Sequence, residues 1–213
     1  MPTSAINSGS DTNLNIGFIA SYNASGMRSV LNAVENGLAV KPTVLICNNK
    51  NANAFKLAKE YDLPAYHLSS KTHEDNAELD QAICDRLQQH EVDLILLSGY
   101  MKKLGPKMLS MYRNKILNIH PSLLPLFGGK GMYGDHVHQA VLDNNAKKTG
   151  ATVHIVTAEY DQGPILNQQS VALENNESLD NIREKVRQIE AHLYVDTLQG
   201  ILSGDIEIPQ SDK

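Results

Sequence analysis

The sequence lacks several features that mark particular classes of protein. Only two cysteines occur in 213 residues, Cys47 and Cys84, and neither belongs to a CxxC pair. We therefore expect two buried free thiols in a reducing compartment rather than a disulfide or a metal site. No apolar run reaches the length of a membrane-spanning helix. A basic excess is also lacking, because the formal net charge is −5, which argues against nucleic acid as a partner.

Residues 1–13 lack the charged and then apolar pattern of a signal peptide, and they are rich in Ser, Asn and Asp. We expect them to form a disordered extension ahead of a single domain over residues 14–204. The overall composition, 41% hydrophobic and 20% charged residues, is ordinary for a globular protein in water. These features predict a cytoplasmic protein without membrane contact.

Apolar and amphipathic stretches alternate along the first half of the chain. Strands are predicted over residues 15–20, 43–47, 64–68 and 92–97, with helices over 27–38, 51–61 and 76–90 between them. This alternation predicts βαβ units and a mostly parallel sheet. Right-handed crossovers then give a doubly wound, Rossmann-like α/β fold with helices on both faces.

The second half follows a different order. A strand ending near His120 is followed by a glycine-rich loop over residues 127–134 and a helix over 135–144. Strands are predicted over residues 151–157 and 165–171. A final helix is expected from Ser178, a plausible N-cap, to about Leu202.

The segment Asn118–Pro125 reads Asn-Ile-His-Pro-Ser-Leu-Leu-Pro and follows a short apolar run. On a strand, Asn118 and His120 point to the same face, because side chains alternate. The two prolines then take the chain out of the sheet, since proline cannot donate to a ladder. Ligands of open α/β sheets bind at the carboxyl ends of strands. A carboxamide and an imidazole at this place therefore predict a site that binds and protonates a substrate oxygen or nitrogen.

Other polar residues are weighed against ordinary structural roles. Asp161 lies in the segment Tyr-Asp-Gln-Gly-Pro, where a turn aspartate is common. The alternative is that Asp161 orients His120 or takes up a proton through water. His154 is expected to be a hydrogen-bonded interior histidine. His136 and His138 do not fit a metal motif such as HExxH, so no metal is expected.

Two loops are rich in small residues. The turn over residues 21–26 opens a helix, whose free N–H groups and dipole favour a phosphate. It is neither a GxGxxG nor a Walker A sequence, so a plain capping turn is the alternative. The glycines of residues 127–134 are expected to allow a mobile or tightly turned lid.

Together, the Asn118–Pro125 motif and Asp161 in its context resemble the formyltransferase family that uses 10-formyltetrahydrofolate. The similarity runs from about Asn15 to Leu202, and Gly99–Leu104 looks like the folate-binding turn of that family. It implies the formyltransferase fold and transfer of a formyl group from 10-formyltetrahydrofolate to the amine of glycinamide ribonucleotide in purine synthesis. A monomer or homodimer that needs no metal is also implied.

The resemblance implies a role for each matching residue. Asn118 and His120 would contact the formyl group and its developing oxyanion, and Asp161 would assist proton transfer. The acceptor would lie against four residues: its phosphate against Ala24, Ser25 and Gly26, and its ribose hydroxyls against Glu190. The folate would lie, largely through backbone groups, against Met101, Lys102, Lys103, Leu104, Asn118, Thr157, Ala158, Glu159, Tyr160 and Asp161.

The sequence does not decide which molecule accepts the formyl group. The family's phosphate turn usually reads Gly-Asn-Gly-Ser-Asn, whereas residues 22–26 here read Tyr-Asn-Ala-Ser-Gly. One alternative is a formyltetrahydrofolate hydrolase, in which water replaces the amine, and another is a formyltransferase for a sugar or tRNA amine. A Rossmann-like binding module without activity is the non-enzyme alternative, and the joint presence of Asn118, His120 and Asp161 argues against it.

Overall fold

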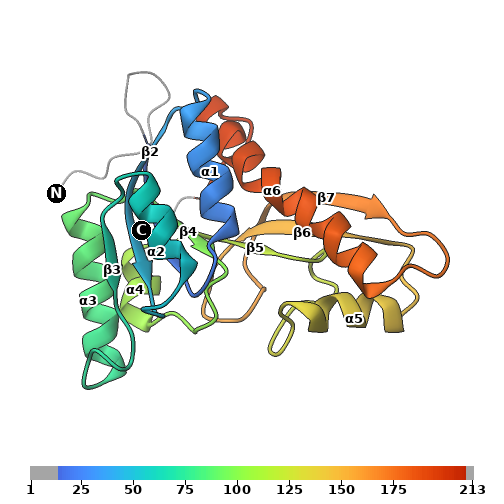
Figure 1. The fold of residues 1–213 in the computed structure, drawn as a ribbon, viewed down its shortest axis with the longest axis horizontal. Coiled ribbons are helices and arrows are strands. Elements are labelled where there is room, and N and C mark those ends of the chain that lie inside the picture. The colour runs from blue at the N-terminus through green and yellow to red at the C-terminus, as the bar shows by residue number, and fades with distance from the viewer. Residues whose placement is uncertain (1–13, 210–213) are drawn as a thin grey trace.

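The computed structural model describes residues 14–209, so the expected extension over residues 1–13 lies outside the described part. Seven strands form one sheet in the order β3-β2-β1-β4-β5-β6-β7 (Figure 1). The strands are β1 (Leu14–Ala20), β2 (Val40–Cys47), β3 (Ala65–His67), β4 (Leu94–Ser98), β5 (Ile116–His120), β6 (Lys148–Ile155) and β7 (Ile165–Ala172). The helices are α1 (Ser25–Glu35), α2 (Asn53–Glu60), α3 (Asn76–Gln89), α4 (Pro106–Met111), α5 (Asp135–Asp143) and α6 (Leu179–Ser203).

The sheet is parallel from β3 to β5, and β6 runs antiparallel between β5 and β7. The chain builds outward from β1 to β3 and then returns to β4 on the other side of β1. This is the double winding that alternating strands and helices predict. The predicted Rossmann-like, mostly parallel α/β fold is therefore confirmed.

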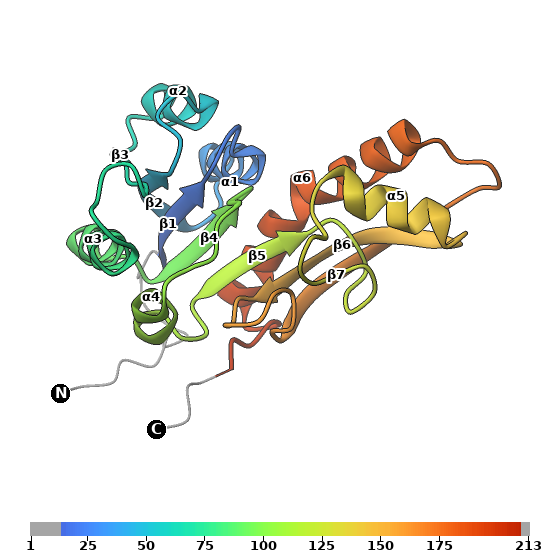
Figure 2. The ribbon, with the colours of Figure 1, turned by 90° about the horizontal axis from the view of Figure 1, so that it is seen from below.

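Helices cover both faces of the sheet (Figure 2). Helices α1, α2 and α6 pack on the face to which Phe18 and Leu96 point. Helices α3 and α4 pack on the face of Ile19 and Ile95. Because successive side chains alternate, β1 and β4 are buried on both faces, which explains their continuous apolar sequences. Both cysteines are buried and free, as expected.

Helix α4 is the one element of residues 14–209 that the sequence analysis does not anticipate. It begins with Pro106, whose fixed φ suits the first helical position. The buried Asp80 of α3 caps it, with Oδ2 accepting from Lys107 N at 2.8 Å and Oδ1 from Met108 N at 3.2 Å. A Cβ at Gly105 would overlap the Asp80 carboxylate, so glycine is required there.

Strand β2 starts at Val40, three residues earlier than predicted. The early part contains Pro42, which cannot donate to a ladder. The register with β1 shifts between Ile16 and Gly17, directly after the pair of Ile16 and Pro42. The Thr43 hydroxyl donates to Ile16 O at 3.3 Å beside this shift, and it supplies the donor that proline lacks.

The turns that follow β1 and β4 lie side by side at the point where the winding direction changes. Ser21 Oγ, after β1, accepts from Met101 N at 2.9 Å, and Ser98 Oγ, at the end of β4, accepts from Met27 N at 3.0 Å. The crevice outside these strand ends is the ligand position typical of open α/β sheets. Within residues 14–209, no helix combines the length and the apolar character that crossing a membrane requires.

Candidate active site

Asn118 and His120 lie two residues apart on β5, and the structure places both on the same face of the sheet. Their partners across the ladder on β6 are His154, opposite Asn118, and Thr152, opposite His120. His120, Thr152 and His154 are all buried. Polar side chains from two adjacent strands therefore gather on one patch of an otherwise apolar sheet, and each of them needs a partner.

Asp161 lies between the two histidines. It comes from the loop that joins β6 to β7 and has a left-handed backbone with φ 56°. Its Oδ2 is 3.6 Å from His120 Nδ1, and its Oδ1 is 3.6 Å from His154 Nε2. The Asp161 side chain is only 11% exposed, so water screens the charge of its carboxylate little. The structure thus brings together the predicted trio Asn118, His120 and Asp161.

His154 fixes the orientation of the Asn118 amide. Its Nδ1 lies 3.0 Å from Ile155 O, which can only accept, so the hydrogen sits on Nδ1. Burial lowers the pKa of His154, which favours the neutral ring. Nε2 is then an acceptor for Asn118 Nδ2 at 3.1 Å. One amide N–H of Asn118 is thereby occupied, and its second N–H and its carbonyl oxygen are left for a substrate.

The glycine-rich loop over residues 127–134 reaches the trio through its backbone, and Figure 2 shows this loop between β5 and α5. Phe127 O lies 2.8 Å from His120 Nε2, and Gly129 N donates to Asp161 Oδ2 at 2.8 Å. A Cβ at Gly128 would lie 2.5 Å from Leu124 Cδ2 and 3.2 Å from Asp161 Cβ. Within the loop, Met132 N donates to Gly129 O at 3.0 Å in a turn, and a role as a lid stays a prediction.

The Pro-Ser-Leu-Leu-Pro turn is held by two residues that the sequence analysis does not single out. Thr152 Oγ1 donates to Ser122 O at 2.6 Å and accepts from Leu124 N at 3.1 Å. Gln168 Nε2, on β7, donates to Leu124 O at 3.0 Å and to Thr152 Oγ1 at 2.8 Å. The signal that could find Thr152 is its place among apolar residues of β6, on the same face as His154.

The predicted phosphate turn combines a left-handed residue with the start of a helix. Ala24 is buried and left-handed, with φ 51° and ψ 48°, a conformation that costs roughly 1–2 kcal/mol without glycine. Ser25 and Gly26 open α1, so their N–H groups have no acceptor within the helix. A Cβ at Gly26 would lie 2.9 Å from the Tyr194 ring, which explains glycine in place of asparagine.

Glu190 lies on α6, one turn before Tyr194. Burial raises the pKa of Glu190 to about 7. Tyr194 donates from its hydroxyl to Leu97 O at 2.7 Å, between β4 and β5. Glu190 and the turn over residues 24–26 therefore flank the same tyrosine at the sheet crevice. Within residues 14–209, no hydrogen bond or ion pair joins either of them to Asn118, His120 or Asp161.

The two segments predicted to hold a folate also meet. The Lys103 ammonium lies 5.7 Å from the centre of the Tyr160 ring, which links the loop after β4 to the loop that carries Asp161. Met101 and Tyr160 are 45% and 47% exposed. Exposed side chains of this kind, with Tyr160 next to Asp161 in the chain, suit a ligand with a flat ring system.

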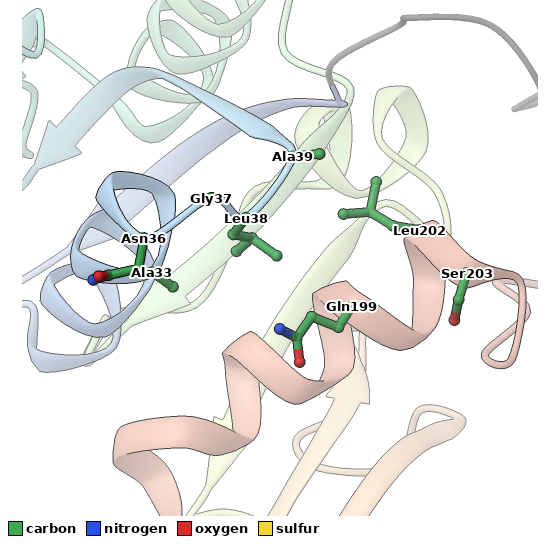
Figure 3. Close-up of a pocket in the computed structure, with 8 residues that line it drawn as sticks. All are labelled: Ala33, Asn36, Gly37, Leu38, Ala39, Gln199, Leu202 and Ser203. Carbon is green, nitrogen blue, oxygen red and sulfur yellow. The ribbon is translucent and has the colours of Figure 1, made fainter.

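A pocket of about 460 Å³ lies elsewhere, between the end of α1, the turn into β2 and the end of α6 (Figure 3). Its eight lining residues are Ala33, Asn36, Gly37, Leu38, Ala39, Gln199, Leu202 and Ser203. None of them is ionisable, so this pocket offers no acid–base group. The polar patch around Asp161 remains the candidate active site. Among residues 14–209, no cluster of three or more His, Cys, Asp and Glu side chains could hold a metal ion.

Comparison with known proteins identifies the family. The chain matches the Formyl transferase family over residues 14–198. Phosphoribosylglycinamide formyltransferase of Bacillus subtilis is 32% identical over 184 residues, which cover 86% of this chain and 92% of that protein. The structure of glycinamide ribonucleotide transformylase 1 from Symbiobacterium toebii has a TM-score of 0.84 at 28% identity, covering 93% of this chain and 95% of its own. A formyltetrahydrofolate deformylase from Pseudomonas syringae, 24% identical, shares the fold with a TM-score of 0.81 over 93% of this chain and 64% of its own. This chain belongs to the formyl transferase family.

Proposed function

We propose that the protein transfers a formyl group from 10-formyltetrahydrofolate to the amine of glycinamide ribonucleotide, as a phosphoribosylglycinamide formyltransferase. The observation that carries this proposal is the convergence of Asn118, His120 and Asp161, with Asp161 Oδ2 3.6 Å from His120 Nδ1. The name of the Bacillus subtilis relative, which this chain matches over 92% of its length, supports the choice of acceptor.

Attack of the amine on the formyl carbon places negative charge on the formyl oxygen. The free N–H of Asn118 and a protonated His120 are the donors for this oxyanion, in a site from which water is largely excluded. Asp161 stabilises the charged imidazole and receives the proton that the attacking amine loses. The folate nitrogen that leaves must regain a proton, and the His120–Asp161 pair returns it.

The acceptor binds at the crevice between β1 and β4. The N–H groups of Ser25 and Gly26 at the start of α1 hold its phosphate, helped by the helix dipole and by the left-handed Ala24. Glu190 accepts from the ribose hydroxyls. Because burial raises its pKa to about 7, Glu190 is a better acceptor at alkaline pH, where it is ionised.

The folate binds between the loops of residues 101–104 and 157–161. The exposed Met101 and Tyr160 offer apolar surface, and the backbone groups of both loops offer hydrogen bonds. Bound there, 10-formyltetrahydrofolate supplies the activated formyl group. The proposal includes a single domain over residues 14–204, a cytoplasmic monomer or homodimer, and a reaction that needs neither a metal nor nucleic acid.

The test is an assay of the purified protein with 10-formyltetrahydrofolate, with and without glycinamide ribonucleotide. We expect turnover that depends on the acceptor, and at least a 1,000-fold loss in a His120→Ala variant that keeps its circular dichroism spectrum. Equal turnover without the acceptor would instead identify a hydrolase. Near-normal transfer by His120→Ala would refute the assigned site.

A further inference from the structure

The loop that follows the Pro-Ser-Leu-Leu-Pro turn contacts both His120 and Asp161 through its backbone. We propose that the backbone carbonyl of Phe127 is a positioning group that holds the hydrogen of neutral His120 on Nε2. Nδ1 is then the nitrogen that gains and loses the catalytic proton. This inference rests on the proposed function and specifies which atom of His120 performs it.

A backbone carbonyl can accept a hydrogen bond but cannot donate one. Phe127 O lies 2.8 Å from His120 Nε2, well within hydrogen-bond distance. Nε2 must therefore carry a hydrogen in both the neutral and the protonated ring. The hydrogen that comes and goes is the one on Nδ1.

Nδ1 faces the rest of the candidate site. It is 3.6 Å from Asp161 Oδ2, which is longer than a direct N–H···O hydrogen bond. At this distance the carboxylate does not hold an Nδ1 proton in a tight shared bond. A substrate atom that approaches Nδ1 can therefore compete for that proton, whereas Nε2 is closed off by the loop.

The backbone of the loop is shaped to deliver this carbonyl. Phe127 has φ 55°, a left-handed conformation that is uncommon for an aromatic residue and costs roughly 1–2 kcal/mol. One hydrogen bond on each side of Phe127 holds the loop in this conformation. Ser122 Oγ donates to Leu126 O at 2.7 Å, and Gly129 N donates to Asp161 Oδ2 at 2.8 Å.

The segment 127–129 therefore contacts both members of the acid–base pair. Phe127 O orients His120, and Gly129 N orients Asp161. Gly128 makes this possible, because a Cβ there would press on Leu124 and on Asp161. A Gly128→Ala substitution should shift the segment and weaken the bond from His120 Nε2. Lys130→Ala is the control, since Lys130 lies in the same loop, is exposed and does not have a positive φ.

The test is 15N NMR of protein labelled at its eight histidines, without substrate. The His120 signals are assigned by their loss in a His120→Asn variant. We expect neutral wild-type His120 to show a protonated Nε2 and an unprotonated Nδ1, and Gly128→Ala to populate the opposite tautomer. A wild-type spectrum with the hydrogen on Nδ1 would overturn the proposal.

Kinetics supply the second measurement. Gly128→Ala should lower kcat at least tenfold, while the dissociation constants of both substrates change less than about twofold and the Lys130→Ala control retains most of kcat. An equal fall of kcat in both variants, or a fall with an unchanged His120 tautomer, would refute the positioning role. The NMR result does not need formyl transfer, so the expected tautomer in a protein that fails to transfer formyl would refute only the proposed function.

Discussion

Replacing Asp161 with Asn tests the charge at the centre of the site with little change in shape. In the structure, the Asp161 carboxylate is 3.6 Å from a ring nitrogen of each histidine and accepts a hydrogen bond from Gly129 N. An asparagine can keep the bond to Gly129, because its side-chain oxygen still accepts. It cannot stabilise a protonated His120 by charge or take up a proton.

The expected magnitude follows from the distance. Two unit charges 3.6 Å apart attract by about 5 kcal/mol at an effective dielectric constant of about 20, which corresponds to about 10³-fold in rate if the charge develops in the transition state. We therefore expect kcat of Asp161→Asn to fall between about 100-fold and 1,000-fold, with KM for either substrate changed less than about threefold.

The control is Asp62→Asn. Asp62 is also a turn aspartate with a left-handed backbone, φ 51°, but it is exposed in the turn between α2 and β3. Steady-state kinetics should show wild-type kcat for this variant. If Asp161→Asn kept its activity as Asp62→Asn does, Asp161 would be an ordinary turn residue and the assigned acid–base pair would be wrong.

Four further changes test other parts of the account. His154→Phe removes the acceptor for Asn118 Nδ2 and should lower kcat about tenfold, the worth of one oriented hydrogen bond; unchanged kinetics would contradict this. Ser25→Asp should raise the dissociation constant of glycinamide ribonucleotide at least tenfold in calorimetry and spare the folate, and equal weakening of both would place the phosphate elsewhere. Burial raises the pKa of Glu190 from 4.5 to about 7, so the folded protein keeps a proton that the unfolded chain loses. The wild-type free energy of unfolding, measured by urea titration, should therefore fall by at most about 3 kcal/mol as pH rises from about 5 to 8. Glu190→Gln should remove that slope, and an unaltered slope would show that Glu190 does not cause it. Gly105→Ala should displace the Asp80 cap of α4 and lower the free energy of unfolding by about 2 kcal/mol, and a neutral effect would refute the steric argument.

Much of the fold follows from local patterns in the sequence. Alternation of apolar strands and amphipathic helices predicts the parallel sheet, and the capping Ser178 marks the start of α6, where its side chain accepts from Asn181 N. Helix α4 is not predicted by these patterns, because six residues are too few for a clear helical period. The proline at its first position is the signal that could have found it.

The site also contains residues that local patterns predict and residues that they do not. Spacing alone puts Asn118 and His120 on one face, because a strand has a period of two. Asp161 joins them only through the folding of a loop that lies 41 residues further along the chain than His120, which local patterns cannot show. The contact between Phe127 O and His120 Nε2 is still harder to predict, because every residue has a carbonyl. It forms in a loop where Phe127 has a left-handed backbone, which the sequence does not reveal.

The most direct measurement is to follow a 13C-labelled formyl group by NMR, starting from 10-[13C]formyltetrahydrofolate and glycinamide ribonucleotide with the purified protein. We predict that the label appears as the formamide of the ribonucleotide, and that leaving out the acceptor keeps it on the folate. Release of the label as formate at the same rate with or without acceptor would contradict the central claim.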